Sequence, residues 1–166
     1  MANYGKTLII IPCGKKKIWS KSQLCGSIKA EDAYISNYFK LCKLYAQRFS
    51  DKWVILSGKY GIIEPTFILD DYDMKLKASE EFQIKVREQL TPIISDGFTQ
   101  IISLCGNYYS CFLRNVLMPF GLTVESPLQG MKIGERQRQL KICLERNKPL
   151  KYGRQKKWIE PRKTIA

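Results

Sequence analysis

Four short apolar runs, each followed directly by a turn of glycine and polar residues, constrain the fold of this chain most strongly. The runs occupy residues 7–12, 53–56, 100–104 and 122–124. Runs of this length are typical of strands buried in a parallel sheet, and parallel strands end at a common edge. Open α/β folds bind their ligands at that edge. The pattern therefore predicts one site built from four turns that are far apart in the sequence.

The segments between the runs have the periodicity of helices. Helices are expected at 30–49, from an N-cap at Ser79 to a stop at Pro92 and the turn after it, at 108–117 and at 133–146. Because strands and helices alternate along the chain, the sequence predicts an α/β fold. The expected form is a three-layer sandwich with a mostly parallel four-stranded sheet flanked by helices.

The length of the chain limits the number of domains. Its 166 residues, 45% of them hydrophobic, are enough for one domain with a sizeable core but not for two. We assign residues 1–146 to a single α/β domain and residues 147–166 to a basic C-terminal tail. Residues 19–29 and 64–77 have no period and are expected to be loops of the domain, and a long ordered loop is often functional.

Charge and composition indicate the class of partner. The chain has 28 Lys and Arg against 15 Asp and Glu, a net charge of +13. This excess indicates an anionic partner, DNA in the first place and RNA as the alternative. Because no apolar stretch is long enough to span a membrane and the first residues lack a signal-peptide core, we expect a cytoplasmic protein without membrane contact. Six cysteines without a CxxC pair, and no histidine, indicate reduced thiols, no metal site and no cofactor.

The C-terminal tail interleaves basic and aromatic side chains. This composition suits an arm that neutralises phosphates and stacks on bases. A solvated tail without a ligand is the alternative. The candidate nucleic-acid contacts are Lys151, Arg154, Lys156, Lys157 and Trp158.

The first two turns hold the candidate anion-binding groups. In the first turn, backbone N–H groups beside a glycine can face an anion that lysines surround. Its candidate substrate-binding residues are Cys13, Gly14, Lys15 and Lys17. In the second turn, Lys59 lies between two glycines and is expected to clamp a phosphate or, if desolvated, to act as a nucleophile. Ser57 and Tyr60 beside it are candidates for substrate binding, and an ordinary exposed turn is the alternative reading.

Three carboxylates are clustered after the second turn, at Asp70, Asp71 and Asp73. A carboxylate near lysines can stabilise an oxocarbenium-like transition state or orient a water, and two carboxylates can hold a divalent metal. We take Asp73 as the candidate catalytic carboxylate, with Lys59 as the second candidate catalytic residue and the adjacent Tyr72 as a substrate-binding residue. For Asp70 and Asp71, pairing with surface lysines is the alternative.

The last two turns supply candidates for recognition of a base. Asn107 carries an amide that can read a base edge, and Tyr108 or Tyr109 can stack on the base, with core packing of one ring as the alternative. Glu135 and Arg136 lie near the start of the last expected helix, where they can line a cleft. An ordinary helix start that favours an acid is the alternative reading.

Several of these motifs resemble a known family. The succession comprises residues 13–17, Phe39, residues 53–61, Pro65, Tyr72 with Asp73, and residues 130–134. It resembles an uncharacterised family of small bacterial and phage proteins that is distantly similar to the YaaA peroxide-stress proteins. The Pro-Cys-x-x-Lys-Lys turn is also similar to a lysine-rich motif of archaeosine synthases. Both resemblances imply association with nucleic acid and a core like that of uracil-DNA glycosylases, although the histidine and the water-activating motif of those enzymes are absent from this sequence.

Together these features favour an enzyme that acts on a base in nucleic acid. The first hypothesis is a DNA N-glycosylase that removes a damaged or modified base, in phage or defence biology. The alternatives are a non-enzymatic DNA-binding protein and a small nucleotide-processing enzyme of the deoxyribosyltransferase type.

Overall fold

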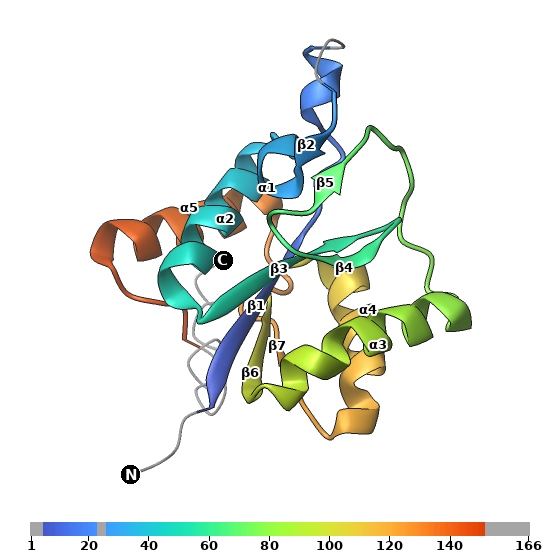
Figure 1. Ribbon diagram of the computed structural model, residues 1–166. Helices are drawn as coiled ribbons and strands as arrows, with labels where there is room; N and C mark the ends of the chain where they lie inside the picture. The colour runs from blue at the N-terminus through green and yellow to red at the C-terminus, as the bar shows by residue number, and fades with distance from the viewer. Residues whose placement is uncertain (1–4, 23–25, 152–166) are drawn as a thin grey trace.

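The apolar runs mark four parallel strands of one sheet, although the fourth run shares only Val124 with its strand (Figure 1). The strands are β1 (Lys6–Pro12), β3 (Lys52–Ser57), β6 (Phe98–Ser103) and β7 (Val124–Glu125). Strand β1 pairs in parallel with β3 on one side and with β6 on the other, and β6 pairs in parallel with β7. The computed structural model describes residues 5–22 and 26–151. The predicted α/β class with a mostly parallel sheet is confirmed.

The sheet has five strands rather than the four predicted. Strand β4 (Gly61–Ile63) pairs antiparallel with β3 and forms the edge of the sheet. Gly61 reverses the chain with a φ of 77°, in the left-handed region that favours glycine. The sequence did not reveal this strand because three residues directly behind a glycine-rich turn are too few to show a period.

A glutamine closes the outer edge of β4. Gln89 comes from helix α3 (Glu80–Ser95). Its Nε2 donates to the carbonyl oxygen of Tyr60 at 2.9 Å, and its Oε1 accepts from the amide of Ile62 at 2.8 Å. The side-chain amide therefore takes the place of a neighbouring strand, and it blocks pairing of this edge with another chain.

The helices follow the expected segments with two differences. Besides α3 they are α1 (Ala30–Ala33), α2 (Asn37–Phe49), α4 (Asn107–Leu117) and α5 (Ile133–Arg146), with 3-10 turns at Ile18–Ser20 and Met118–Phe120. The expected helix 30–49 is two helices, because Tyr34 is extended and Ser36 caps α2 by accepting from the amide of Phe39 at 3.1 Å. Helix α3 begins after the predicted N-cap Ser79 but continues past Pro92. A proline this close to the end removes a single helical hydrogen bond, and the helix ends at the predicted turn after it, where Gly97 has a φ of 93°.

Helices cover both faces of the sheet. Helices α2 and α5 lie on one face and α3 and α4 on the other (Figure 1). Along β1, Ile9 and Ile11 pack into the first layer of core and Leu8 and Ile10 into the second. All four side chains are fully buried, which explains why this strand is apolar without alternation.

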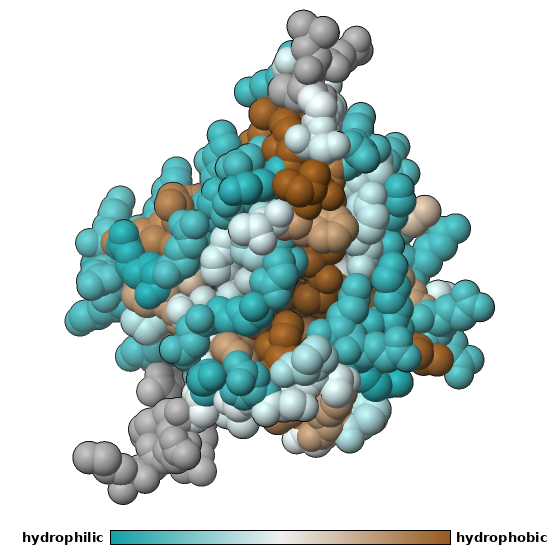
Figure 2. All heavy atoms as spheres, in the orientation of Figure 1, coloured by the Kyte–Doolittle hydropathy of each residue, from teal (hydrophilic) through white to brown (hydrophobic). Residues whose placement is uncertain are grey.

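The two segments expected to be loops meet in a second, small sheet. Strand β2 (Ile28–Lys29) pairs antiparallel with β5 (Ile68–Leu69). Figure 2 shows an apolar strip that runs from this small sheet down past β4, between hydrophilic surfaces. The pairing anchors the segment that continues from β5 to α3. Of the helices in residues 5–22 and 26–151, none is long and apolar enough to cross a membrane.

Candidate functional site

A cavity of about 340 Å³ lies where the chain leaves the carboxyl ends of β1 and β6. It is lined by Cys13, Gly14, Lys15, Lys17, Tyr72, Asp73, Met74, Lys75, Leu76, Tyr108 and Tyr109. These residues come from the turn after β1, from the segment between β5 and α3, and from the first turn of α4. The cavity lies at the sheet edge that the sequence predicted, but only two of the four predicted turns, those after β1 and β6, line it. The turns after β3 and β7 contribute no lining residue.

Gly58 holds the cavity wall close to the sheet. A Cβ atom on this residue would lie 2.6 Å from the carbonyl oxygen of Met74 and 2.6 Å from the amide nitrogen of Leu76. Both are backbone atoms, so no side-chain rotation relieves the contact. The close approach of residues 74–76 therefore requires a residue without a Cβ at the end of β3.

Lys17 is a buried cation within the cavity wall. The residue is only 8% exposed, and its Nζ lies 4.4 Å from the centre of the Tyr72 ring. Within residues 5–22 and 26–151, no carboxylate or other hydrogen-bond acceptor contacts this ammonium group. The tyrosine ring stabilises the positive charge in part, since a cation is attracted to the face of an aromatic ring.

A chain of three buried hydroxyls supports the Tyr72 ring. The hydroxyl of Tyr72 is hydrogen-bonded to the hydroxyl of Tyr34 on one side and to Ser57 Oγ, 2.8 Å away, on the other. Burial raises the pKa of Tyr72 to about 12, and burial raises the pKa of Tyr34 further. Both phenols therefore stay protonated at neutral pH, and the chain fixes the ring that faces Lys17.

Asp73 and Lys59 both line a second depression that adjoins the cavity. Asp73 and Lys75 line both, while Gly58 and Lys59 line only the second. Lys59 is exposed, and its Nζ lies 5.1 Å from the centre of the Tyr60 ring and 5.9 Å from that of Tyr72. The carboxylate of Asp73 is exposed as well, so solvent and a ligand can both reach it.

Two tyrosines from the first turn of α4, Tyr108 and Tyr109, line another part of the cavity. Tyr108 is 57% exposed, and its ring centre lies 6.1 Å from that of Tyr109. Burial raises the pKa of Tyr109, and the neighbouring Cys13 raises it further. The cavity therefore combines aromatic surface with a hydroxyl and a thiol that face each other.

The candidate residues differ in how they relate to the cavity. Cys13, Gly14, Lys15, Lys17, Tyr72, Asp73 and Tyr108 line it, and Lys59 lies in the adjoining depression. Ser57 is fully buried beneath Tyr72, and the Tyr60 ring packs edge-on against Tyr72 at 5.5 Å. These two residues support the site instead of facing it.

The remaining candidates lie outside the lining. Asn107 and Glu135 are exposed, and Arg136 donates through Nε to the carbonyl oxygen of Met131 at 2.9 Å. Asp70 accepts from Ser27 Oγ at 2.5 Å, so its partner is a serine and not a lysine. Of the proposed nucleic-acid arm, Lys151 is exposed, while Arg154, Lys156, Lys157 and Trp158 lie outside the described residues. Leu150 packs into the core and its amide donates to the hydroxyl of Tyr45, so the chain up to this point is part of the folded domain.

Four residues of the site were not among the sequence candidates. Met74, Lys75 and Leu76 line the cavity through the segment that Gly58 holds in place. Their position directly after Asp73 was an available signal. Tyr34 falls within the helix expected at 30–49, and no local signal connects it with Tyr72, 38 residues further on.

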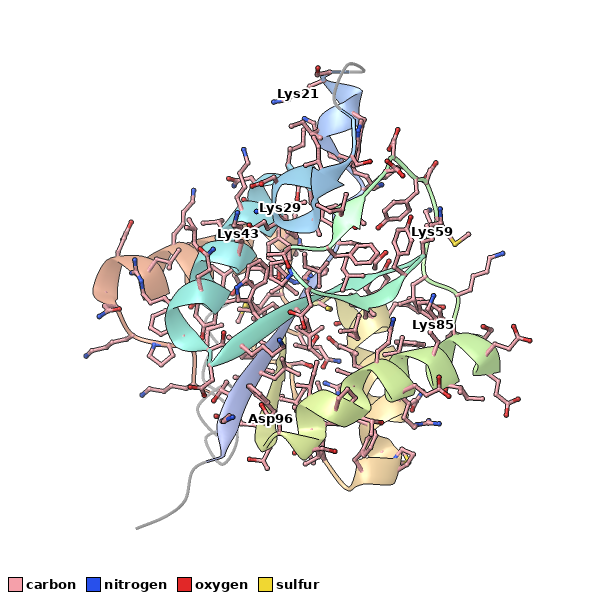
Figure 3. The ribbon with its side chains drawn as sticks, viewed as in Figure 1. Lys21, Lys29, Lys43, Lys59, Lys85 and Asp96 are labelled. Atoms are coloured by element: carbon pink, nitrogen blue, oxygen red, sulfur yellow. The ribbon has the colours of Figure 1, made fainter. Side chains whose placement is uncertain are left out.

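Lysines lie both on the outer surface and in the cavity. The lysines labelled in Figure 3 come from separate segments of the chain: Lys21, Lys29, Lys43, Lys59 and Lys85. The cavity itself has three lysines, at 15, 17 and 75, against the single carboxylate of Asp73. In the described ranges no three His, Cys, Asp or Glu side chains are grouped as a metal site.

The fold and the cavity define the class as an α/β protein with a lysine-rich cavity at the carboxyl edge of its sheet. Residues 8–142 match the model of a family of unknown function, DUF6884, and the chain belongs to that family. Over 116 residues the chain is 37% identical to the uncharacterized protein YfjM of Bacillus subtilis (strain 168). The matched region covers 68% of this chain and 77% of that protein. No solved structure matches the chain.

Proposed function

We propose that this protein is a three-layer α/β enzyme that cleaves the N-glycosidic bond of a damaged or modified base in DNA. One observation carries the proposal: an exposed carboxylate, Asp73, lines a small cavity that also contains a buried cation and the rings of Tyr72, Tyr108 and Tyr109. A flipped base needs aromatic surface to stack on, and the sugar that loses it needs a carboxylate nearby.

The proposed reaction uses Asp73 on the sugar side of the bond. The C1′–N bond breaks with its electron pair going to the base, and positive charge develops on the sugar. Asp73 stabilises that charge and orients a water whose oxygen attacks C1′, and the proton released by the water ends on the departing base.

Lys59 has one of two roles in this scheme. As a clamp, its ammonium group binds a backbone phosphate beside the second depression. As a nucleophile, its amine attacks C1′ in place of water, and the product is an imine with the opened sugar. Its exposure and its place in the same depression as Asp73 are compatible with both.

The cavity also supports a second candidate function, a nucleotide-processing enzyme of the deoxyribosyltransferase type. A volume of about 340 Å³ is at the lower end of the range of about 300–1,000 Å³ found for ligand cavities. A free nucleotide fits such a site without any arm that binds DNA.

Base release decides between these functions. The protein is incubated with oligonucleotides that carry different modified bases and then with alkali, which cleaves a strand at abasic sites. We expect cleavage at one class of modified base and none in plain DNA. Intact strands across a broad panel, together with base exchange on free nucleotides, would establish the transferase instead. Intact strands from a protein that still binds DNA would support a non-enzymatic DNA-binding protein.

Borohydride trapping assigns the role of Lys59. A covalent complex between the protein and the substrate, lost in Lys59→Gln, shows an amine nucleophile. Base release without a trapped complex leaves Lys59 as a clamp.

A shortened chain tests the proposed arm. It should end after Lys151, because Leu150 belongs to the core. If the arm binds DNA, the shortened chain has a lower affinity and a smaller dependence of affinity on salt. Unchanged affinity and salt dependence would contradict an arm.

A further inference from the structure

Lys17 is the most unusual charged group in the described part of the molecule. The residue is 8% exposed, lines the cavity, and has the Tyr72 ring as its one described contact for the ammonium group. Burial of an ammonium group is costly unless an anion or hydrogen-bond acceptors compensate it. A ring face compensates only part of that cost. The remaining compensation is available from an anion inside the cavity.

The turn after β1 offers further donors beside Lys17. The amide of Cys13 is used by the sheet, where it donates to the carbonyl oxygen of Leu56 at 3.2 Å. The amides of Gly14 and Lys15 donate to no acceptor within the described ranges. Both residues line the cavity together with Lys17. Successive free amides next to an ammonium group suit the several oxygens of a phosphate better than the two of a carboxylate.

The rest of the cavity wall is aromatic and apolar. Tyr108 and Tyr109 contribute rings, and Met74 and Leu76 contribute apolar surface. A planar base packs on such surface, whereas a sugar phosphate alone leaves it exposed. The volume of about 340 Å³ admits one such ligand and not a run of nucleotides.

We propose that the cavity binds a single nucleotide, with its phosphate at Lys17 and at the amides of Gly14 and Lys15, and with its base against Tyr108 and Tyr109. The inference deepens the proposed function, because it assigns the two ends of the ligand. The phosphate site itself stands on Lys17, whatever reaction the cavity supports. The nucleotide is a free mononucleotide or one nucleotide of a DNA strand, and the phosphate contact is the same in both.

Alkylation of Cys13 reports occupancy of the cavity without knowledge of the reaction. Cys13 lines the cavity and is partly exposed, and Cys111 is exposed on α4 outside it. Iodoacetamide should therefore modify both, and peptide mapping by mass spectrometry separates them. Cys42 and Cys105 are buried and serve as unreactive controls. Burial raises the pKa of Cys105 to about 12, which keeps its thiol protonated.

The probes are inorganic phosphate, the four deoxynucleoside monophosphates, the matching deoxynucleosides and a short single-stranded oligonucleotide. We expect the monophosphates to protect Cys13 and not Cys111, at concentrations at least about tenfold below those of the nucleosides, because the phosphate contributes charged hydrogen bonds. Inorganic phosphate should protect more weakly than the monophosphates. Protection by the oligonucleotide and not by the monophosphates would assign the ligand to a DNA strand and still support the phosphate site.

Three lysine variants of the same turn isolate the contribution of Lys17. Lys17→Met keeps the length of the side chain and removes the charge, and we expect at least about tenfold weaker protection by the monophosphates. Lys16→Met is the matched control, because Lys16 is exposed and lies outside the cavity lining. Lys17→Arg keeps the charge and should retain part of the protection, which separates charge from folding.

Equal protection by nucleosides and monophosphates in the wild-type protein would overturn the phosphate site without any variant. Equal protection of Lys17→Met and Lys16→Met by the monophosphates would overturn it as well. Failure of the proposed function gives a different result: nucleotides protect Cys13, but no oligonucleotide in the panel releases a base. Base release by a protein that no phosphate-containing probe protects would support the enzyme and refute the phosphate site.

Discussion

The hydroxyl of Tyr72 is the hydrogen-bond partner of both other buried hydroxyls beneath the site, those of Tyr34 and Ser57. Tyr72→Phe removes that hydroxyl alone. Ser57 Oγ accepts from the amides of Lys59 and Tyr60, both at 3.2 Å. Its own proton is therefore free to be donated to Tyr72, 2.8 Å away. The hydroxyl of Tyr34 meets the same atom from the other side.

The cost of Tyr72→Phe follows from this arrangement. Ser57 is fully buried and Tyr34 is 2% exposed, so water does not replace the lost partner at either hydroxyl. A buried polar group left without a partner costs about 1–3 kcal/mol. Two such groups give an expected loss of about 2–4 kcal/mol in the free energy of unfolding, since each can relax in part. For a chain of this length the midpoint of thermal unfolding should fall by roughly 5–15 °C.

Urea unfolding followed by circular dichroism measures this loss, with Tyr60→Phe as the matched control. Tyr60 packs against the same ring, but its hydroxyl bonds to no residue in the described ranges. Its removal should change stability by less than about 0.5 kcal/mol. If Tyr72→Phe costs no more than Tyr60→Phe, the hydroxyl chain does not stabilise the fold. Addition of Ser57→Ala to Tyr72→Phe should cost less than the two changes separately, because they remove the same hydrogen bond.

Three further changes test other parts of the structure. Gly58→Ala places a Cβ against the backbone of residues 74–76, so it should lower the free energy of unfolding in urea by roughly 1–3 kcal/mol and weaken ligand protection of Cys13. Gly134→Ala is the control, because no atom lies near its Cβ and the change should cost nothing. An equal effect of both changes would contradict the close approach. Gln89→Leu leaves the edge amide and carbonyl of β4 without partners and should cost about 1–3 kcal/mol in the same assay, whereas a loss below about 0.5 kcal/mol would mean that water replaces the glutamine. Burial raises the pKa of Tyr72 from 10.0 to about 12, so the unfolded chain loses this proton first and stability should fall between about pH 10 and pH 12 by up to about 1.4 kcal/mol per pH unit for this residue. Tyr72→Phe should show a shallower decline, and an equal slope would contradict the raised pKa.

The parallel part of the sheet could be predicted because the signal for each strand, an apolar run followed by a turn, lies within a short stretch of sequence. Three of the four parallel strands, β1, β3 and β6, are six or seven residues long and end in a turn, and right-handed connections then bring the turns to one edge. This topology rule was enough to predict that Lys17 and Tyr108 lie at one site, whereas Asp73 belongs to the segment between β5 and α3, which the rule does not place. Strand β4 could not be found in the same way, because its position depends on pairing with β3 and on Gln89 from a helix.

The supporting layer of the site could not be predicted for a related reason. Tyr34 and Tyr72 meet only after the β2–β5 sheet has brought their segments together. In the sequence, Tyr34 belongs to an apolar stripe that a core helix explains fully. The Gly58 contact is likewise between backbones from distant segments, and a glycine after a strand gives no sign of what approaches it.

The single-turnover rate of base release is the most direct test of the central claim, which is that Asp73 acts on the sugar of a bound nucleotide. It should be measured on the best modified oligonucleotide for wild type, Asp73→Asn and Asp71→Asn. Asp71 is an exposed carboxylate two residues away that does not line the cavity, so it controls for the loss of charge. We predict that Asp73→Asn slows release by at least about a hundredfold and that Asp71→Asn changes it less than about twofold. Equal rates for the two variants would contradict a catalytic role for Asp73 and, with it, the proposed enzyme.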